Sequence, residues 1–134
     1  MIDLVYHILT NDAGVTAITT NVYADARQQQ DSTPGIVIEW VATDDEYALG
    51  GAVCNNVYTV DLIGYSKDMA TAHGLLDAMR EAINTLNGNY TTAAGNTYTV
   101  IASDITDRNI ETIVDLDIIE SSLTVEITTN DTPS

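Results

Sequence analysis

The sequence has little of what disulfide-rich, zinc-binding or disordered proteins contain. Cys54 is its single cysteine, so the chain can form neither an internal disulfide nor a cysteine-based zinc site, and a reducing compartment is expected. With 45% hydrophobic residues and only 2 prolines and 8 glycines, the chain is neither disordered nor fibrous. Its 134 residues predict one globular domain, residues 1–134, with a frayed end at residues 130–134.

Basic residues are also scarce. The chain has 4 Lys and Arg against 20 Asp and Glu, which gives a formal net charge of −16. Nucleic-acid-binding surfaces neutralise phosphates with Lys and Arg, so specific nucleic-acid binding is not expected. Two interpretations of the acidity remain open: a solvated acidic surface, or a surface that lies beside DNA without binding it.

The first residues combine a helical pattern with the lack of a targeting signal. Met1–Tyr6 contains neither a basic leader nor a long apolar run, so we expect no signal peptide and no membrane span, and a protein that stays in the cytoplasm. Apolar residues at helical spacing predict a short helix over Ile2–Leu9. Asn11 or Asp12 can then cap a further turn.

A longer helix is the strongest secondary-structure signal. Apolar residues form one stripe over Met69–Leu86, and either Ser66 or Asp68 can cap its start. Gly88 lies where a left-handed residue would end the helix. A polar turn is expected over Asn87–Asn96.

Four strands are predicted from alternating apolar and polar residues. The first two are expected to pair antiparallel, because they follow one another along the chain. A further stretch, Ile110–Ile119, reads either as an extra strand or as an irregular arm. The four strands span Ile36–Thr43, Val57–Gly64, Tyr98–Thr106 and Leu123–Thr128.

A projecting loop is predicted between the first two strands, over Asp44–Asn56. It is too long for a tight hairpin turn and contains residues that tolerate positive φ. Its carboxylates, like those of Asp115–Glu120, offer oxygen ligands but lack the spacing of a calcium-binding loop. No metal site is therefore predicted.

The order of these elements predicts an α+β fold. We expect an antiparallel β-sheet with two main α-helices packed on one face, and no parallel crossover is required. The other face of that sheet would carry more apolar residues than a solvated face should, which indicates subunit contacts. These residues are Val37, Val41, Val57, Ile63 and Ile101.

No catalytic constellation emerges from the sequence. His7 and His73 fall on separate helices without further ligands at metal-binding spacing. Cys54 follows an acidic segment, which disfavours a reactive thiolate. Asp104 and Asp107 could pair as acid and base, but no aromatic pocket accompanies them. The sequence therefore predicts no enzyme activity and no cofactor.

Several short segments, taken in order, resemble the tail completion, or tail terminator, family of long-tailed bacteriophages. Each segment alone is a weak signal, but their order and spacing cover nearly the whole chain. The segments are Val22–Ala24, Pro34–Trp40, Glu46–Gly51, Tyr58–Ser66 and the helix Met69–Leu86.

The resemblance implies a structural virion protein with several partners. It implies a homo-oligomer, a hexameric ring, that terminates the tail tube and joins it to the head-side connector or stopper protein. DNA would pass through the lumen without specific binding, and no membrane would be involved. The ring would assemble in the host cytoplasm and lie at the head–tail junction of the virion. By loop position, partner contacts or the channel would involve Asp44, Asp45, Glu46, Tyr47 and Leu49.

Three alternatives remain open at the level of sequence. A tail tube or neck stopper subunit would use similar sheets and rings. An acidic DNA mimic would occupy a nucleic-acid-binding protein, and a small bacterial enzyme of unknown type would need a catalytic group that the sequence does not reveal. Under the ring hypothesis, mutual repulsion keeps free subunits apart, so ring formation should increase with salt.

Overall fold

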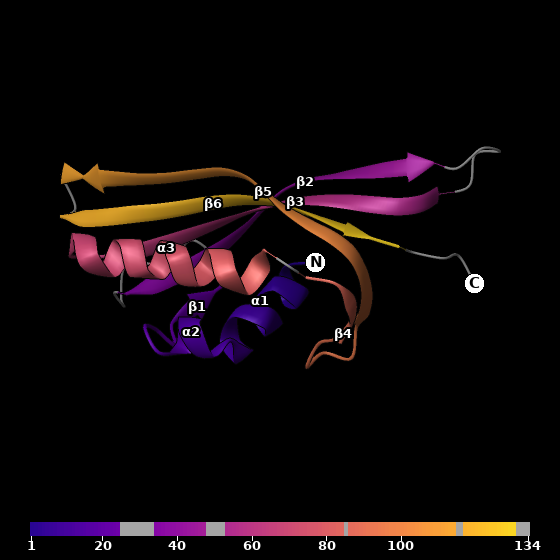
Figure 1. Ribbon diagram of the computed structural model, residues 1–134, viewed down its shortest axis with the longest axis horizontal. Helices are drawn as coiled ribbons and strands as arrows, with labels where there is room; N and C mark the ends of the chain where they lie inside the picture. Colours follow the sequence, from indigo (N-terminus) through magenta and orange to yellow (C-terminus); the bar gives the residue numbers. More distant parts are fainter. Residues whose placement is uncertain (25–33, 48–52, 85, 115–116, 131–134) are drawn as a thin grey trace.

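A six-stranded sheet in the order β1-β2-β3-β6-β5-β4 forms the body of the protein (Figure 1). The computed structural model describes residues 1–24, 34–47, 53–84, 86–114 and 117–130. The elements in chain order are α1 (Ile2–Asn11), α2 (Ala13–Thr16), β1 (Val22–Tyr23), β2 (Gly35–Tyr47), β3 (Val53–Ser66), α3 (Met69–Ile83), β4 (Gly88–Thr91), β5 (Thr97–Ile113) and β6 (Ile118–Thr129).

The predicted fold class is wrong. Strands dominate, the sheet is mixed and curls into a half-barrel, and α3 is the one main helix, so the fold is not an antiparallel sheet with two main helices. The mixed character comes from β1, which pairs parallel to β2 through Val22 opposite Ile36 and Tyr23 opposite Val37. A strand of two residues is too short to show a period-2 alternation, which is why the sequence did not reveal it.

Irregularities in the long strands accompany the curl. The pairing register shifts between Trp40 and Ala42 on β2, and again on β5 at two places, next to Val100 and next to Ile105. Such bulges bend a strand and increase its twist. Regular alternation of apolar and polar residues in the sequence predicts neither the bulges nor the curvature.

The helix starts follow the predicted caps. The Asp12 side chain accepts the Val15 N–H at 3.0 Å and caps α2. The Asp68 side chain accepts the Thr71 N–H at 2.8 Å and caps α3. The predicted helix end is wrong, because α3 ends at Ile83, whereas Gly88, with φ +114°, begins β4.

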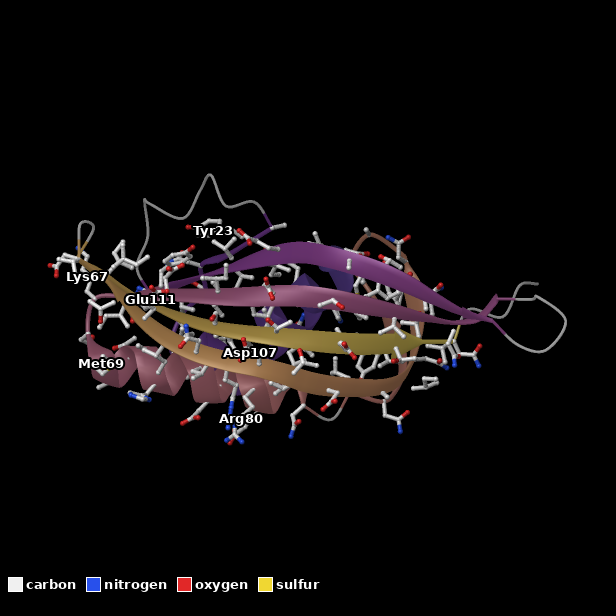
Figure 2. All side chains as sticks on the ribbon, turned by 90° about the horizontal axis from the view of Figure 1, so that it is seen from above. Tyr23, Lys67, Met69, Arg80, Asp107 and Glu111 are labelled. Carbon is white, nitrogen blue, oxygen red and sulfur yellow. The ribbon has the colours of Figure 1, made fainter. Side chains whose placement is uncertain are left out.

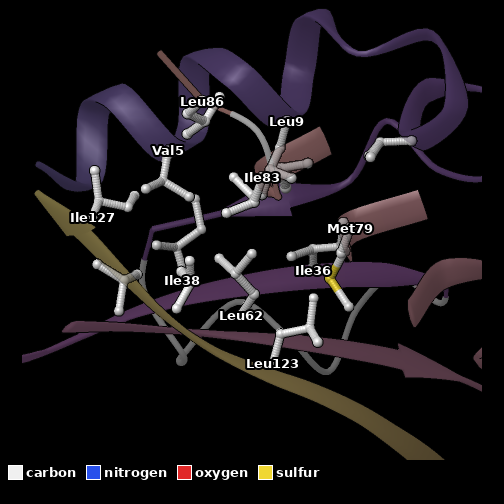
Figure 3. Packing of buried hydrophobic residues seen from close by; sticks show 14 of the residues in the cluster. Val5, Leu9, Ile36, Ile38, Leu62, Met79, Ile83, Leu86, Leu123 and Ile127 are labelled. Carbon is white, nitrogen blue, oxygen red and sulfur yellow. The ribbon is translucent and has the colours of Figure 1, made fainter. Parts of the chain in front are cut away.

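The core lies between the sheet and the helices (Figure 3). Alternate residues of the strands enter this core, as the period of a strand requires: Ile36 and Ile38 of β2, Val60 and Leu62 of β3, and Leu123, Val125 and Ile127 of β6. The side chains with no exposed surface include Leu4, Leu9, Ile36, Leu62, Leu75, Met79, Ile83, Leu123 and Ile127.

Helix α3 lies close to the sheet at Gly64 on β3. A Cβ atom there would lie 2.6 Å from Cδ2 and 3.1 Å from Cγ of Leu75, which is fully buried on α3. Replacing Gly64 by Ala is therefore expected to lower the free energy of unfolding by about 1–3 kcal/mol, measured by urea denaturation. Gly74→Ala is the matched control, because its Cβ would meet only Ile18 Cδ1 at 3.6 Å. This control should raise stability by about 0.5–1 kcal/mol, and equal effects of the two changes would contradict the packing argument.

Candidate assembly surfaces

The β2–β3 hairpin ends in a two-stranded arm, defined as Asp45–Tyr47 with Val53–Asn55. Asp45, at the base of the arm, lies opposite Asn56, which is the residue where β3 begins to pair with β6. The other arm residues pair only across the hairpin among the strands that the structure describes. Figure 1 shows this end of β2 and β3 extending beyond the helices. A ribbon of two strands is only marginally stable by itself, so the arm is suited to ordering against a partner.

The arm corrects the prediction of a long loop over Asp44–Asn56. The residues Asp44, Asp45, Glu46 and Tyr47 end β2, and β3 begins at Val53. Leu49, the fifth residue expected at a contact, lies outside the described residues. Acidic residues have low strand propensity, but pairing with a neighbouring strand overrides it in this hairpin.

The helix-free face of the sheet carries rows of carboxylates that face each other across strands. Glu39 lies opposite Asp61, Glu111 opposite Glu120, and Asp104 opposite Glu126. Residues opposite one another share a face, and each of these strand positions alternates with a core position. We call this surface the acidic face and define it by Glu39, Asp61, Asp104, Asp107, Glu111, Glu120 and Glu126.

Like charges directly opposite each other destabilise a sheet, and the acidic face has few cations nearby. In Figure 2, Asp107 and Glu111 lie along this face, whereas Lys67 and Arg80 lie at its margin. Arg80 is 3.9 Å from Asp77 of its own helix. The acidic face therefore presents largely uncompensated negative charge.

Hydrogen bonds position several of these carboxylates. Thr124 Oγ1 donates to Asp61 Oδ1 at 2.6 Å, and the Arg108 backbone N–H donates to Asp107 Oδ1 at 2.9 Å. Both acids border a hollow of about 290 Å³, which is also lined by Glu111, Glu120, Ser122 and Thr124. Ile63 and Asn109 complete the lining, and its four carboxylates make the hollow unsuited to an anion.

Glu120 and Tyr65 are coupled at one end of this face. Burial raises the pKa of Glu120, the Tyr65 hydrogen bond opposes the rise, and the charges of Glu111 and Glu39 add to it. Burial and the Glu120 carboxylate raise the pKa of Tyr65 to about 12. Because the folded-state pKa of Glu120 is raised, its ionised form costs stability. The cost declines as the pH falls through that pKa and is gone below the unfolded-state pKa.

A second polar cluster holds α1 to the β4–β5 turn. The Asp3 carboxylate accepts hydrogen bonds from Tyr98 Oη at 2.7 Å, Asn96 Nδ2 at 2.9 Å and Thr92 Oγ1 at 3.2 Å. The Met1 ammonium lies 3.1 Å from it. Burial alone would raise the pKa of Asp3, but these hydrogen bonds and the ammonium outweigh burial and hold the pKa well below its usual range. The cluster joins segments that are far apart in sequence.

Replacing Asp3 by Asn is expected to lower the free energy of unfolding at pH 7 by about 1–3 kcal/mol, because buried donors lose a charged acceptor. The folded-state pKa of Asp3 lies below the unfolded value, so its contribution is complete above about pH 5 and declines as the pH falls. Urea denaturation of both proteins at several pH values should therefore show a difference that shrinks on acidification. A constant difference from pH 7 to pH 3 would contradict the ionised role of Asp3.

The predicted catalytic and metal candidates are dispersed. Within the described part of the chain, no group of three or more His, Cys, Asp or Glu side chains could hold a metal ion. His7 lies on α1 and His73 on α3. No helix of the described residues is both long and apolar enough to cross a membrane.

The fold defines the class first: a curled mixed sheet with a projecting two-stranded arm and an acidic face. The family model of tail completion protein gp17 matches residues 3–119, so the chain belongs to this family of phage tail proteins. The resemblance inferred from the sequence is thereby confirmed, and the family is a structural one.

Solved structures with a similar fold include a chain of the "Virion of native gene transfer agent (GTA) particle", with a TM-score of 0.76 and 15% sequence identity. The match covers 98% of this chain and 95% of that chain, so the two share the fold over nearly their full lengths. No curated protein matches the sequence significantly.

Proposed function

We propose that this protein is a structural component of a phage virion that forms a hexameric ring, terminates the tail tube and joins it to the head-side connector. Family membership over residues 3–119 is the observation that carries the proposal. The shared fold with a chain from a gene transfer agent virion supports the place in a particle. In this role the protein acts by binding and not by turnover.

The arm is proposed to contact a neighbouring ring or to border the channel. Asp45, Glu46 and Tyr47 form its β2 side, Asp44 directly precedes it, and Leu49 follows in the sequence. Three of these residues carry negative charge, and the hairpin continues beyond the pairing of β3 with β6. A tail tube protein or a stopper protein with a complementary surface would then order the ribbon.

The acidic face supports the part of the proposal that concerns DNA. Carboxylates repel phosphates over a screening length of roughly 8 Å at physiological ionic strength. A lumen bordered by such a surface would let DNA pass without specific binding. The same acidity also favours the alternative of a DNA mimic, which would bind a basic partner protein and form no ring.

Immunogold electron microscopy of purified particles tests the proposed function. Antibody label confined to the head–tail junction is expected, and cryo-EM of the labelled particles would then resolve the order of the rings. Label along the whole tail would instead identify a tail tube subunit. Absence from particles would overturn the virion role and favour the DNA mimic.

A further inference from the structure

Strands β2 and β5 are only partly covered by the short outermost strands β1 and β4. β1 pairs with Ile36 and Val37 at the start of β2, and β4 pairs with Thr97–Val100 at the start of β5. Beyond these points, Ile38–Tyr47 pairs with β3 alone and Ile101–Ile113 pairs with β6 alone, among the strands that the structure describes. Alternate backbone N–H and C=O groups of a strand point toward each side, so both stretches offer groups for further pairing.

We propose that the β2 edge of one subunit pairs with the β5 edge of a second copy, so that the sheet continues from subunit to subunit. This inference rests on the proposed ring and identifies the surface that closes it. The two edges lie on opposite sides of the same sheet. Their pairing is therefore head to tail, which is the type of contact that generates rings.

Charge makes this contact dependent on salt. The β2 stretch carries Glu39, Asp44, Asp45 and Glu46 and no basic residue. The β5 stretch carries Asp104, Asp107 and Glu111 together with the exposed Arg108, which lies opposite Leu123. Both edges are thus acidic, and their pairing is expected only where salt screens the repulsion.

Exposed apolar residues mark the β5 edge independently. Large hydrophobic side chains on the surface include Ile101, which is 44% exposed, and Val114, which is 84% exposed. Ile101 begins the uncovered part of β5, and Val114 follows directly after its last residue, Ile113. In a chain with a net charge of −16, this placement indicates a contact that removes both from water.

The curl of the sheet fits the same contact. Bulges next to Val100 and Ile105 bend β5, and one next to Ala42 bends β2. Subunits joined through curved sheets rotate relative to one another at each step, and a constant rotation closes a ring when it divides a full turn. Flat sheets joined in this way would extend without closing.

Proline variants test the pairing, because proline removes the backbone donor of an edge. On β2 the pair is Ala42→Pro and Thr43→Pro, and on β5 it is Asn109→Pro and Thr112→Pro. The two amides of each pair are an odd number of residues apart, so one points to the open edge and the other into the sheet. Proline at the inward amide would break a hydrogen bond of the subunit and lower its stability. The variant that unfolds in urea like the wild type is therefore the one used. Ala93→Pro is the matched control, since Ala93 occupies the second position of the turn closed by Gly95 N–H donating to Thr92 O at 2.9 Å.

Native mass spectrometry of the full chain, in salt at which the wild type forms rings, gives the result. Each edge variant alone is expected to remain monomeric, and a mixture of one β2 variant with one β5 variant should form a 1:1 complex and nothing larger. The Ala93→Pro control should still form rings. Rings from the edge variants, a dimer of either variant alone, or no complex in the mixture would each overturn the pairing.

The localisation experiment keeps the two proposals separate. Label at the head–tail junction together with rings that tolerate both edge substitutions would leave the proposed function intact and overturn the edge pairing. A wild-type chain that stays monomeric in every salt and on isolated tail tubes would overturn both. Label along the tail together with a 1:1 mixed complex would keep the pairing and overturn only the role as terminator.

Discussion

Ring formation is expected to increase steeply with ionic strength. The chain carries a net charge of −16, and Glu111 and Glu120 lie directly opposite each other on the acidic face. Raising the salt from about 0.01 M to about 1 M shortens the screening length from roughly 30 Å to roughly 3 Å, which removes most of the repulsion between subunits. Sedimentation velocity over this range should show monomers at low salt and rings at high salt.

Neutralising one row of the acidic face should shift that transition to lower salt. The test variant combines Glu111→Gln with Glu120→Gln, and it should also unfold at higher urea, because an opposed like-charged pair costs about 0.2–1 kcal/mol. The control combines Asp77→Asn with Glu81→Gln, which removes the same charge from the exposed side of α3. A transition that is the same in all three proteins, or independent of salt, would remove the electrostatic part of the assembly hypothesis.

Replacing Leu62 by Ala is expected to cost about 2–5 kcal/mol of unfolding free energy. Leu62 has no exposed surface and lies between Ile38 and Leu123 on the adjacent strands, close to Met79 of α3 (Figure 3). The loss is a large fraction of the stability of an ordinary domain, so the variant should unfold at much lower urea.

Ile101→Ala is the matched apolar control for Leu62. Ile101 is 44% exposed, and its truncation should change the unfolding free energy of the monomer by less than about 0.5 kcal/mol. Similar losses in the two variants would contradict the assignment of the core. If Ile101 lies in a subunit contact, its effect should appear in assembly and not in the stability of the monomer.

The sequence predicted those elements in which a helical or alternating pattern of apolar residues continues over many positions. Helix α3 has a continuous apolar stripe, and the central strands β3 and β6 alternate over many residues. The predicted polar turn over Asn87–Asn96 contains β4, whose four residues owe their pairing to β5 and not to their own propensity. The ambiguous stretch Ile110–Ile119 divides into the end of β5 and the start of β6.

The net negative charge follows from the composition, but the gathering of the carboxylates on one face of the sheet could not be predicted from it. Glu39 and Asp61 come from β2 and β3, whereas Glu111 and Glu120 come from β5 and β6, and only the strand order and register bring them to one surface. A partial signal was present, because these acids occupy positions that alternate with core residues. The sequence instead drew attention to the run Asp44–Glu46, which ends β2.

The order of the strands also constrains when the subunit can fold during its synthesis. β3 lies at the centre of the sheet, but one of its two neighbours is β6, and Ser66 pairs with Ile119 while Asn56 pairs with Thr129. The ribosome must therefore translate the chain to Thr129 before the central ladder is complete. Until then β3 has no partner on its β6 side, so the sheet that carries the acidic face is incomplete.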